Sequence, residues 1–130
     1  PDYLTALDFL YQQLPMYQKI GGKALKPGLD NIRRFLAALD NPEDQFRSVH
    51  LAGTNGKGST SHMIAAILQA SGLKTGLYTS PHYKDFRERV KIDGHLVPED
   101  YVLDFVNRNY NTIQEIQPSY FELTVALAFA

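Results

Sequence analysis

This 130-residue chain has no cysteine, and its positive and negative charges nearly balance. The first absence excludes disulfide scaffolds, cysteine zinc sites and thiol nucleophiles, and it fits a cytoplasmic protein. The net charge is −1, so nothing favours a general affinity for nucleic acid or for an anionic membrane. No apolar run reaches membrane-spanning length, and the first residues lack a signal-peptide pattern. The hydrophobic content of 44% is enough for the core of one modest domain.

The two ends of the sequence lead us to expect a piece of a longer protein. The first residues are Pro1 and Asp2, without an initiator methionine. Residues 121–130 are mostly apolar and break off abruptly. A mature protein seldom ends on an unfinished apolar helix, because such a helix leaves an apolar patch exposed.

The most informative motif is a glycine-rich stretch at residues 53–59, GTNGKGS. Glycines let backbone N–H groups approach an anion without a Cβ in the way, and the start of a helix directs its positive dipole end to the same place. Lys57 adds a full positive charge that can reach terminal phosphates. The stretch departs from the general P-loop pattern, because Leu51 stands where the first glycine belongs and Gly58 separates the lysine from Ser59. The alternative interpretation is a glycine-rich turn with an incidental lysine.

The flanks of this stretch predict a strand–loop–helix–strand unit. Residues 46–52 are partly β-branched and apolar toward their end, as expected of a buried strand. After Ser59, apolar residues recur at helical spacing until Gly72, which is a natural helix stop. Residues 75–79 predict the second strand. Such a crossover implies a parallel sheet, whose ligands bind at the carboxyl ends of the strands, where the glycine-rich stretch lies.

Local signals predict the remaining elements. Asp93–Gly94 is typical of a tight hairpin turn, and Pro98 is suited to the first position of a helix. The expected elements are helices over residues 3–14 and 30–39, a polar loop over 80–89, a hairpin over 90–97, a helix from Pro98 and a last helix from Pro118.

Two blocks resemble a known enzyme family. Residues 50–60 resemble the ATP loop of folylpolyglutamate synthase and dihydrofolate synthase, which belong to the Mur ligase superfamily. Residues 78–90 resemble the Ω loop of that family, with Tyr83 in place of the usual leucine, and residues 26–32 and 121–122 match as well. The resemblance implies an α/β fold in which residues 1–130 form the N-terminal portion of a P-loop-containing Mur-ligase-type ATPase domain. It implies a mostly parallel sheet flanked by helices, and the C-terminal glutamate-binding domain of the family is absent from this sequence.

The activity implied by the resemblance is ATP-dependent ligation of L-glutamate to dihydropteroate, to folates or to both. ATP would phosphorylate a carboxylate, and the glutamate amine would attack the acyl phosphate. The implied cofactors are ATP and Mg²⁺, and the expected protein is a cytoplasmic monomer without nucleic-acid or membrane partners. The family's main acidic metal ligand and its glutamate-binding domain lie downstream, so we expect the chain alone to be inactive. The alternatives are another Mur-type amide ligase, an unrelated P-loop NTPase, or a nucleotide-binding module without catalysis.

The resemblance also assigns nucleotide-binding and metal-binding residues. Lys57 would bridge the β and γ phosphates as the catalytic residue, and the hydroxyl of Ser59 or Thr60 would support Mg²⁺. Ser80 matches a Mg²⁺ ligand of the Ω loop, although Ser80–Pro81 also fits simple turn initiation. The residues expected to bind the nucleotide are Thr54, Asn55, Gly56, Lys57, Gly58 and Ser59.

Two segments are implied to bind the folate-type substrate. Phe121 matches an aromatic residue that packs on the flat pterin ring, although ordinary core packing would also explain it. Glu122 has a structural alternative too, because Ser119 and Glu122 have the spacing of a capping box, which we expect to be its main role. The residues assigned to this substrate are Leu25, Lys26, Pro27, Gly28, Leu29, Ser119, Tyr120, Phe121 and Glu122.

The charged part of the Ω loop allows two interpretations. Arg87, Glu88 and Arg89 fit a solvated charge run, whereas the resemblance implies that they order the loop near substrate. His82 invites assignment as a metal ligand or general base, but the sequence offers it no evident partners, and the resemblance favours a role in shaping the loop. His50 and His62 are expected to be packing or surface residues.

Overall fold

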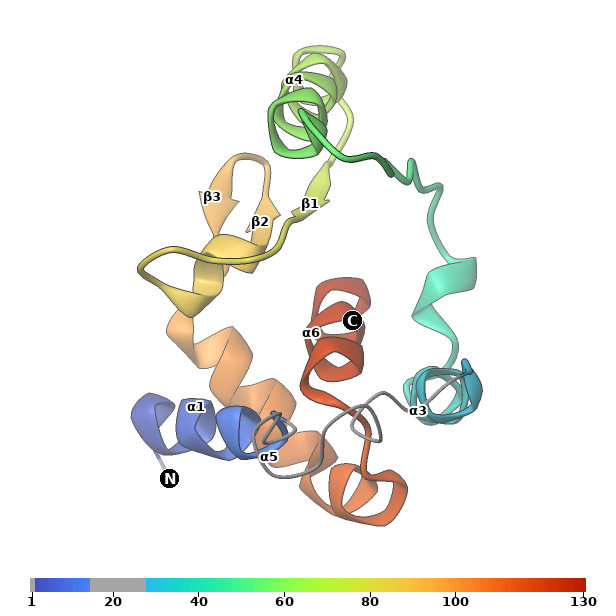
Figure 1. Cartoon of the computed structure of the whole chain (residues 1–130), viewed down its shortest axis with the longest axis vertical. Coiled ribbons are helices and arrows are strands. Elements are labelled where there is room, and N and C mark those ends of the chain that lie inside the picture. Colours follow the sequence, from blue (N-terminus) through green and yellow to red (C-terminus); the bar gives the residue numbers. More distant parts are fainter. Residues whose placement is uncertain (1, 15–27) are drawn as a thin grey trace. The chain divides into compact units, whose positions relative to one another are not determined.

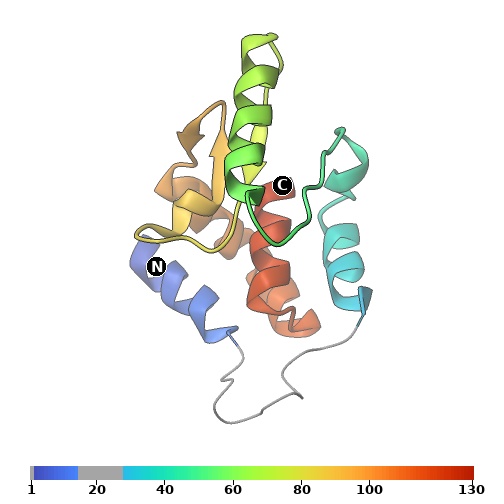
Figure 2. The same ribbon diagram turned by 45° about the horizontal axis from the view of Figure 1, so that its top comes forward.

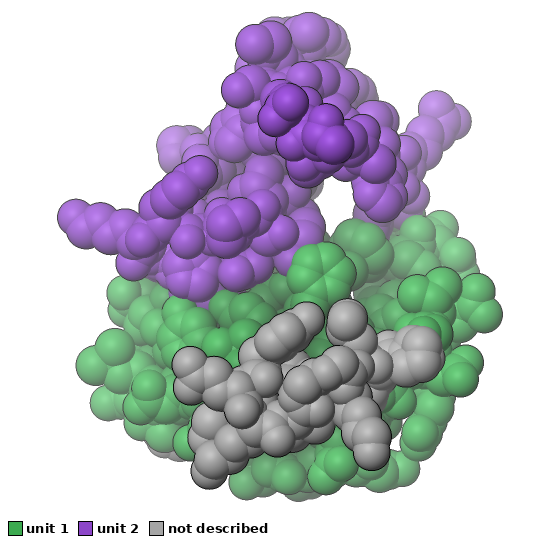
Figure 3. All heavy atoms as spheres, viewed as in Figure 1, with its two compact units in different colours: residues 1–45, 99–130 green, residues 46–98 purple. Residues whose placement is uncertain are grey.

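The computed structural model describes residues 2–14 and 28–130. The substrate residues expected at Leu25, Lys26 and Pro27 lie outside the described residues. The chain divides into two compact units, one of residues 1–45 and 99–130 and the other of residues 46–98, which Figure 3 colours separately.

Unit 1 is helical. Its elements are α1 (Tyr3–Gln12), α3 (Asp30–Ala38), the short 3₁₀ helix η2 (Pro42–Asp44), α5 (Glu99–Ile116) and α6 (Tyr120–Phe129). The four α-helices confirm the predicted ones to within a few residues at their ends. Both α5 and α6 pack against α1 and α3, and Figures 1 and 2 show α6 beside α3. Unit 1 is therefore a small helical bundle.

Apolar side chains at helical spacing make the core of this bundle. Val102, Phe105 and Val106 of α5 are buried, and the ring of Phe105 meets that of Phe35 edge to face, with 6.2 Å between the ring centres. The Tyr101 hydroxyl donates a 2.9 Å hydrogen bond to the carbonyl oxygen of Leu127 and so ties α5 to α6. These contacts fix α6, which carries the expected substrate residues.

Unit 2 contains one long helix and a small sheet. Its elements are α4 (Lys57–Ala70), β1 (Gly76–Tyr78), the 3₁₀ helix η3 (Phe86–Arg89), β2 (Val90–Ile92) and β3 (His95–Leu96). Gly72 ends α4 as predicted: its φ is +83°, and the N–H groups of Gly72 and Leu73 bond back to Gln69 and Leu68. The β2–β3 hairpin also forms as predicted, with positive φ at both Asp93 and Gly94.

The predicted parallel sheet is not confirmed. The sheet has the order β1-β2-β3, and both pairings are antiparallel. The strand expected over residues 46–52 is wrong for this structure, because these residues are irregular and almost all exposed. A buried parallel strand needs neighbours at both edges, and within the described residues no segment pairs with 46–52. Among the described residues, no helix is long and apolar enough to cross a membrane.

Candidate functional site

The glycine-rich stretch leads directly into α4, which begins at Lys57. Gly56 caps this helix with φ +77°, a backbone conformation that glycine adopts without strain, and it has no side chain to occupy the first N–H groups. A Cβ at Gly53, Gly56 or Gly58 would meet only open space. The stretch is thus an exposed cradle at the N-terminus of a 14-residue helix, the geometry that binds anions.

Side chains at the start of α4 contact backbone carbonyl oxygens of the glycine-rich stretch. The Lys57 ammonium donates to the carbonyl oxygen of Gly53 and lies 3.5 Å from that of Thr54. One turn further on, the His62 ring lies 2.7 Å from the carbonyl oxygen of Gly58. The residues expected to bind the nucleotide, 54–59, are contiguous and all exposed, so they are accessible to a ligand.

The Ω loop, residues 80–89, is closed at its base by main-chain bonds. Tyr78 pairs with Val90 in the sheet, and the Thr79 N–H continues this pairing by donating to the Arg89 carbonyl oxygen at 3.0 Å. Ser80 follows directly and is exposed, and the Ser80–Pro81 peptide bond is cis. The base of the loop therefore continues the β1–β2 ladder, with Ser80 at the point where the chain leaves it.

The tip of the Ω loop is organised by one carboxylate. Glu88 accepts hydrogen bonds from three consecutive backbone N–H groups, those of Tyr83, Lys84 and Asp85, at 3.0, 2.9 and 2.7 Å. These donors stabilise the ionised form and hold the pKa of Glu88 below its usual value. Asp85 in turn caps η3 and forms an ion pair with Arg87 at 2.8 Å, which lowers the pKa of Asp85. Of the two interpretations of these charged residues, the structure therefore favours a bonded network that orders the loop over a solvated charge run.

Arg89 is the exception among these charged residues, because its side chain is buried, with 8% exposed. Its Nε donates a 2.8 Å hydrogen bond to Nδ1 of His82, whose ring also meets Phe86 edge to face. Burial and the Arg89 charge lower the pKa of His82, while Glu88 and Asp85 oppose that shift. His82 therefore shapes the loop as the resemblance implied, through a partner that the sequence did not reveal.

The expected substrate residues of unit 1 differ in exposure. Phe121 is 57% exposed as a residue, so ordinary core packing does not explain it in this structure. Tyr120 is buried and stacks on Tyr11, with 5.7 Å between the ring centres, so its side chain is part of the core of unit 1. Gly28 and Leu29, just before α3, are exposed.

Glu122 and Ser119 form the predicted capping box. The Ser119 N–H donates to the Glu122 carboxylate at 2.7 Å, and the Glu122 N–H donates to the Ser119 hydroxyl at 3.2 Å. Both polar side chains are therefore used at the start of α6, where they satisfy N–H groups that the helix leaves open.

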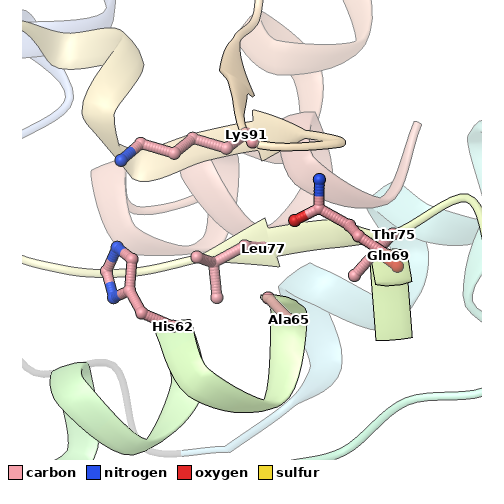
Figure 4. A pocket seen from close by; sticks show the side chains of 7 residues that line it. His62, Ala65, Gln69, Thr75, Leu77 and Lys91 are labelled. Carbon is pink, nitrogen blue, oxygen red and sulfur yellow. The ribbon is translucent and has the colours of Figure 1, made fainter. Parts of the chain in front are cut away.

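A small pocket of about 90 Å³ lies between α4 and the sheet of unit 2 (Figure 4). It is lined by His62, Ala65, Gln69, Thr75, Leu77, Lys91 and Gly94. Because none of the residues expected to bind nucleotide or folate lines it, this pocket is separate from the candidate site.

The candidate magnesium ligands are hydroxyl groups of the glycine-rich stretch and of the Ω loop, not a cluster of carboxylates. Within residues 2–14 and 28–130, no group of three or more His, Cys, Asp or Glu side chains could hold a metal. Ser59, Thr60 and Ser80 are exposed and offer hard oxygen ligands. Magnesium commonly keeps several waters and takes phosphate oxygens alongside one or two protein ligands, so these residues fit a nucleotide-bound ion.

Comparison with known proteins identifies the relatives of this chain, although no family model matches it. It is 44% identical over 105 residues to a probable bifunctional folylpolyglutamate synthase/dihydropteroate synthase of Haloferax volcanii, covering 81% of this chain and 12% of the relative. It is 36% identical over 111 residues to the dihydrofolate synthase/folylpolyglutamate synthase of Bacillus subtilis, covering 81% of this chain and 26% of the relative. The chain belongs to the family of folylpolyglutamate and dihydrofolate synthases.

Solved structures of such synthases share the fold of the chain. A folylpolyglutamate synthase of Thermotoga maritima matches with a TM-score of 0.85 and 34% identity, over 98% of this chain and 29% of that one. A structure described as a folylpolyglutamate synthase complex with AMPPCP and folate matches with a TM-score of 0.84 and 33% identity, over 99% of this chain and 32% of that one. The neighbours have the Mur ligase fold, which supports the expected α/β class. The chain spans less than a third of the length of each of these synthases.

Proposed function

We propose that this chain is the N-terminal portion of the ATP-binding domain of a longer synthase that joins L-glutamate to dihydropteroate, to folates or to both. ATP first phosphorylates the acceptor carboxylate, and the glutamate amine then displaces phosphate from the acyl phosphate. The observation that carries this proposal is the exposed glycine cradle at the start of α4, with Lys57 as its first helical residue. A related synthase of the same fold, solved with an ATP analogue and folate, supports it.

The chain contributes the phosphate-binding part of such a site. A carboxylate and a triphosphate repel each other, so the reaction needs positive groups between them. The N–H groups at the start of α4 and the Lys57 ammonium supply positive charge that is fixed to the protein. To reach a phosphate, the ammonium exchanges the Gly53 carbonyl oxygen for phosphate oxygens. The hydroxyls of Ser59, Thr60 and Ser80 would hold Mg²⁺, which when bound screens the phosphate charges.

The residue proposed to bind the pterin ring of the folate-type acceptor is the exposed aromatic Phe121. A flat pterin ring needs an aromatic or apolar wall, and Phe121 is an exposed aromatic residue. Gly28 and Leu29 are further members of this substrate surface in the proposal. Tyr120 contributes by anchoring the start of α6 on Tyr11, and Ser119 and Glu122 contribute by fixing the first turn of α6.

The test is release of ADP by the full-length synthase that carries this chain, with ATP, Mg²⁺ and glutamate, and with dihydropteroate or tetrahydrofolate added separately. Turnover with dihydropteroate alone identifies a dihydrofolate synthase, turnover with tetrahydrofolate alone identifies a folylpolyglutamate synthase, and turnover with both identifies a bifunctional enzyme. Lys57→Met is the matched inactive control. ADP release that neither acceptor stimulates would contradict the folate assignment and favour another amide ligase or an NTPase.

Three narrower expectations stay predictions beside this proposal. The first is that residues 1–130 alone do not turn over, because they supply only part of the site. The second is that the synthase is a monomer, and the third is that it works in the cytoplasm. An assay of residues 1–130 alone checks the first, and sedimentation and cell fractionation of the full-length protein check the second and third.

A further inference from the structure

Arg89 is bonded to both residues that flank the Ser80–Pro81 dipeptide. On one side, its carbonyl oxygen accepts the Thr79 N–H at 3.0 Å. On the other side, its guanidinium donates to Nδ1 of His82 at 2.8 Å. A single residue at the end of η3 thus holds the short segment that contains Ser80 from both ends.

The burial of Arg89 makes this arrangement more than a surface contact. An arginine keeps its charge at all ordinary pH values, and a buried charge is costly unless it is bonded. With 8% of the residue exposed, the guanidinium is held in the base of the loop rather than in solvent. Arg87, two positions earlier, instead pairs with Asp85 of its own turn.

The tip of the loop is stabilised separately. The Glu88 carboxylate bonds the backbone N–H groups of residues 83–85, which lie beyond His82, whereas its main-chain carbonyl oxygen accepts the Thr79 hydroxyl at 3.3 Å. Loss of the Glu88 carboxylate would therefore loosen the tip, whereas loss of the Arg89 guanidinium would release the His82 end of the Ser80 segment and leave the main-chain bond to Thr79 in place. This separation gives the inference a specific test.

We propose that Arg89 is a positioning residue that fixes Ser80, through Thr79 and His82, as a hydroxyl ligand for the nucleotide-bound metal ion. The inference rests on the proposed function only in taking Ser80 as a ligand of that ion. Outer groups that orient a metal ligand commonly change metal affinity or activity by about 10- to 100-fold when they are removed. The effect expected for Arg89 is therefore on metal affinity rather than on fold.

The experiment measures Mn²⁺ binding to the full-length synthase with a non-hydrolysable ATP analogue, by electron paramagnetic resonance and without turnover. We expect Arg89→Gln to weaken Mn²⁺ binding by about tenfold or more, and to raise the Mg²⁺ concentration for half-maximal ADP release in parallel. Glu88→Gln should leave Mn²⁺ affinity nearly unchanged. Arg108→Gln, an exposed arginine of α5 in unit 1, is the control for removal of one positive charge.

A second pair of variants covers the case in which Arg89→Gln unfolds. His82→Asn keeps an acceptor near the position of Nδ1, and His82→Leu removes it. We expect Mn²⁺ affinity close to wild type for the first and weakened for the second, and His82→Leu with Arg89→Gln should cost no more than either alone. Equal Mn²⁺ affinities for His82→Asn and His82→Leu would overturn the inference, and so would an Arg89→Gln protein that only melts earlier. Failure of the proposed function is separate, since it would appear as wild-type ADP release that folate and glutamate do not stimulate.

Discussion

The ammonium of Lys57 is bonded to the carbonyl oxygen of Gly53, four residues earlier in the same glycine cradle. The glycine-rich stretch therefore holds the Lys57 ammonium, the positive charge proposed to bind the phosphates, next to its own backbone. This contact lies at the surface, where a lost hydrogen bond affects the fold little.

Replacement of Lys57 by methionine should therefore abolish turnover but not folding. We expect kcat of the full-length synthase to fall by about 100-fold or more, because a fixed positive group at the transferred phosphate is lost. The free energy of unfolding should change by less than about 0.5 kcal/mol. Steady-state ADP release and urea unfolding measure the two effects. A variant with near-normal kcat would show that the lysine is incidental to the glycine turn.

Glu122 should behave as a helix cap. Glu122→Ala removes the carboxylate that accepts the Ser119 N–H, and we expect a loss of about 0.5–1 kcal/mol in the free energy of unfolding. Glu122→Gln keeps an acceptor and should lose less. Urea unfolding of both variants is the measurement. If Glu122→Gln stopped turnover while the fold stayed intact, the carboxylate would have a chemical role that capping does not supply.

Phe121 should govern acceptor binding. Since more than half of the residue is exposed, Phe121→Ala should cost the fold little, yet it removes the aromatic wall proposed for the pterin. We expect KM for the folate-type acceptor to rise about tenfold, with KM for ATP unchanged. Phe121→Tyr keeps a ring and serves as the matched control. Equal increases in both KM values would point to a general disturbance of α6.

The Ω loop should lose order in acid because of Glu88. The N–H groups of Tyr83 and Asp85, followed by that of Lys84, lower the folded-state pKa of Glu88 below the unfolded value of 4.5. A lowered folded pKa means that the stabilisation is complete above the unfolded pKa and is lost as the pH falls through the folded value. Amide hydrogen exchange of residues 83–85 should therefore lose protection in that acid range. Glu88→Gln should lack this pH dependence, and an unaltered acid response in that variant would assign the effect to Asp85 instead.

Local signals predicted the helices and caps of this chain, whereas features that depend on distant partners were missed. The Ser119–Glu122 box and the Gly72 stop are properties of a few adjacent residues, and both are confirmed. The strand over 46–52 was wrong because a parallel strand exists only through its neighbours. The Arg89–His82 bond was missed because it forms inside an irregular loop, where no periodic pattern indicates which side chains meet.

The site residues of α6 show the same division. Tyr120, Leu123 and Leu127 recur at helical spacing and are buried, so this pattern could have placed Tyr120 in the core. Phe121 falls outside that stripe and is exposed, and nothing in the pattern alone distinguishes a binding residue from one covered by another part of the protein. The resemblance to the synthases supplied that distinction as a hypothesis.

The outward face of α4 tests the proposal that the chain is part of a larger domain. Met63 and Ile67, one helical turn apart, are 63% and 65% exposed. If this face stays exposed in the full-length protein, replacing both residues by alanine should change the free energy of unfolding by about 0.5 kcal/mol or less. If the remainder of the synthase covers this face, the double substitution removes buried apolar groups, and we expect a loss of about 2–5 kcal/mol in the full-length protein. Urea unfolding of that protein measures the loss, with Arg108→Gln as the exposed control. A loss no larger than that of the control would mean that α4 keeps this face in solvent in the full-length protein.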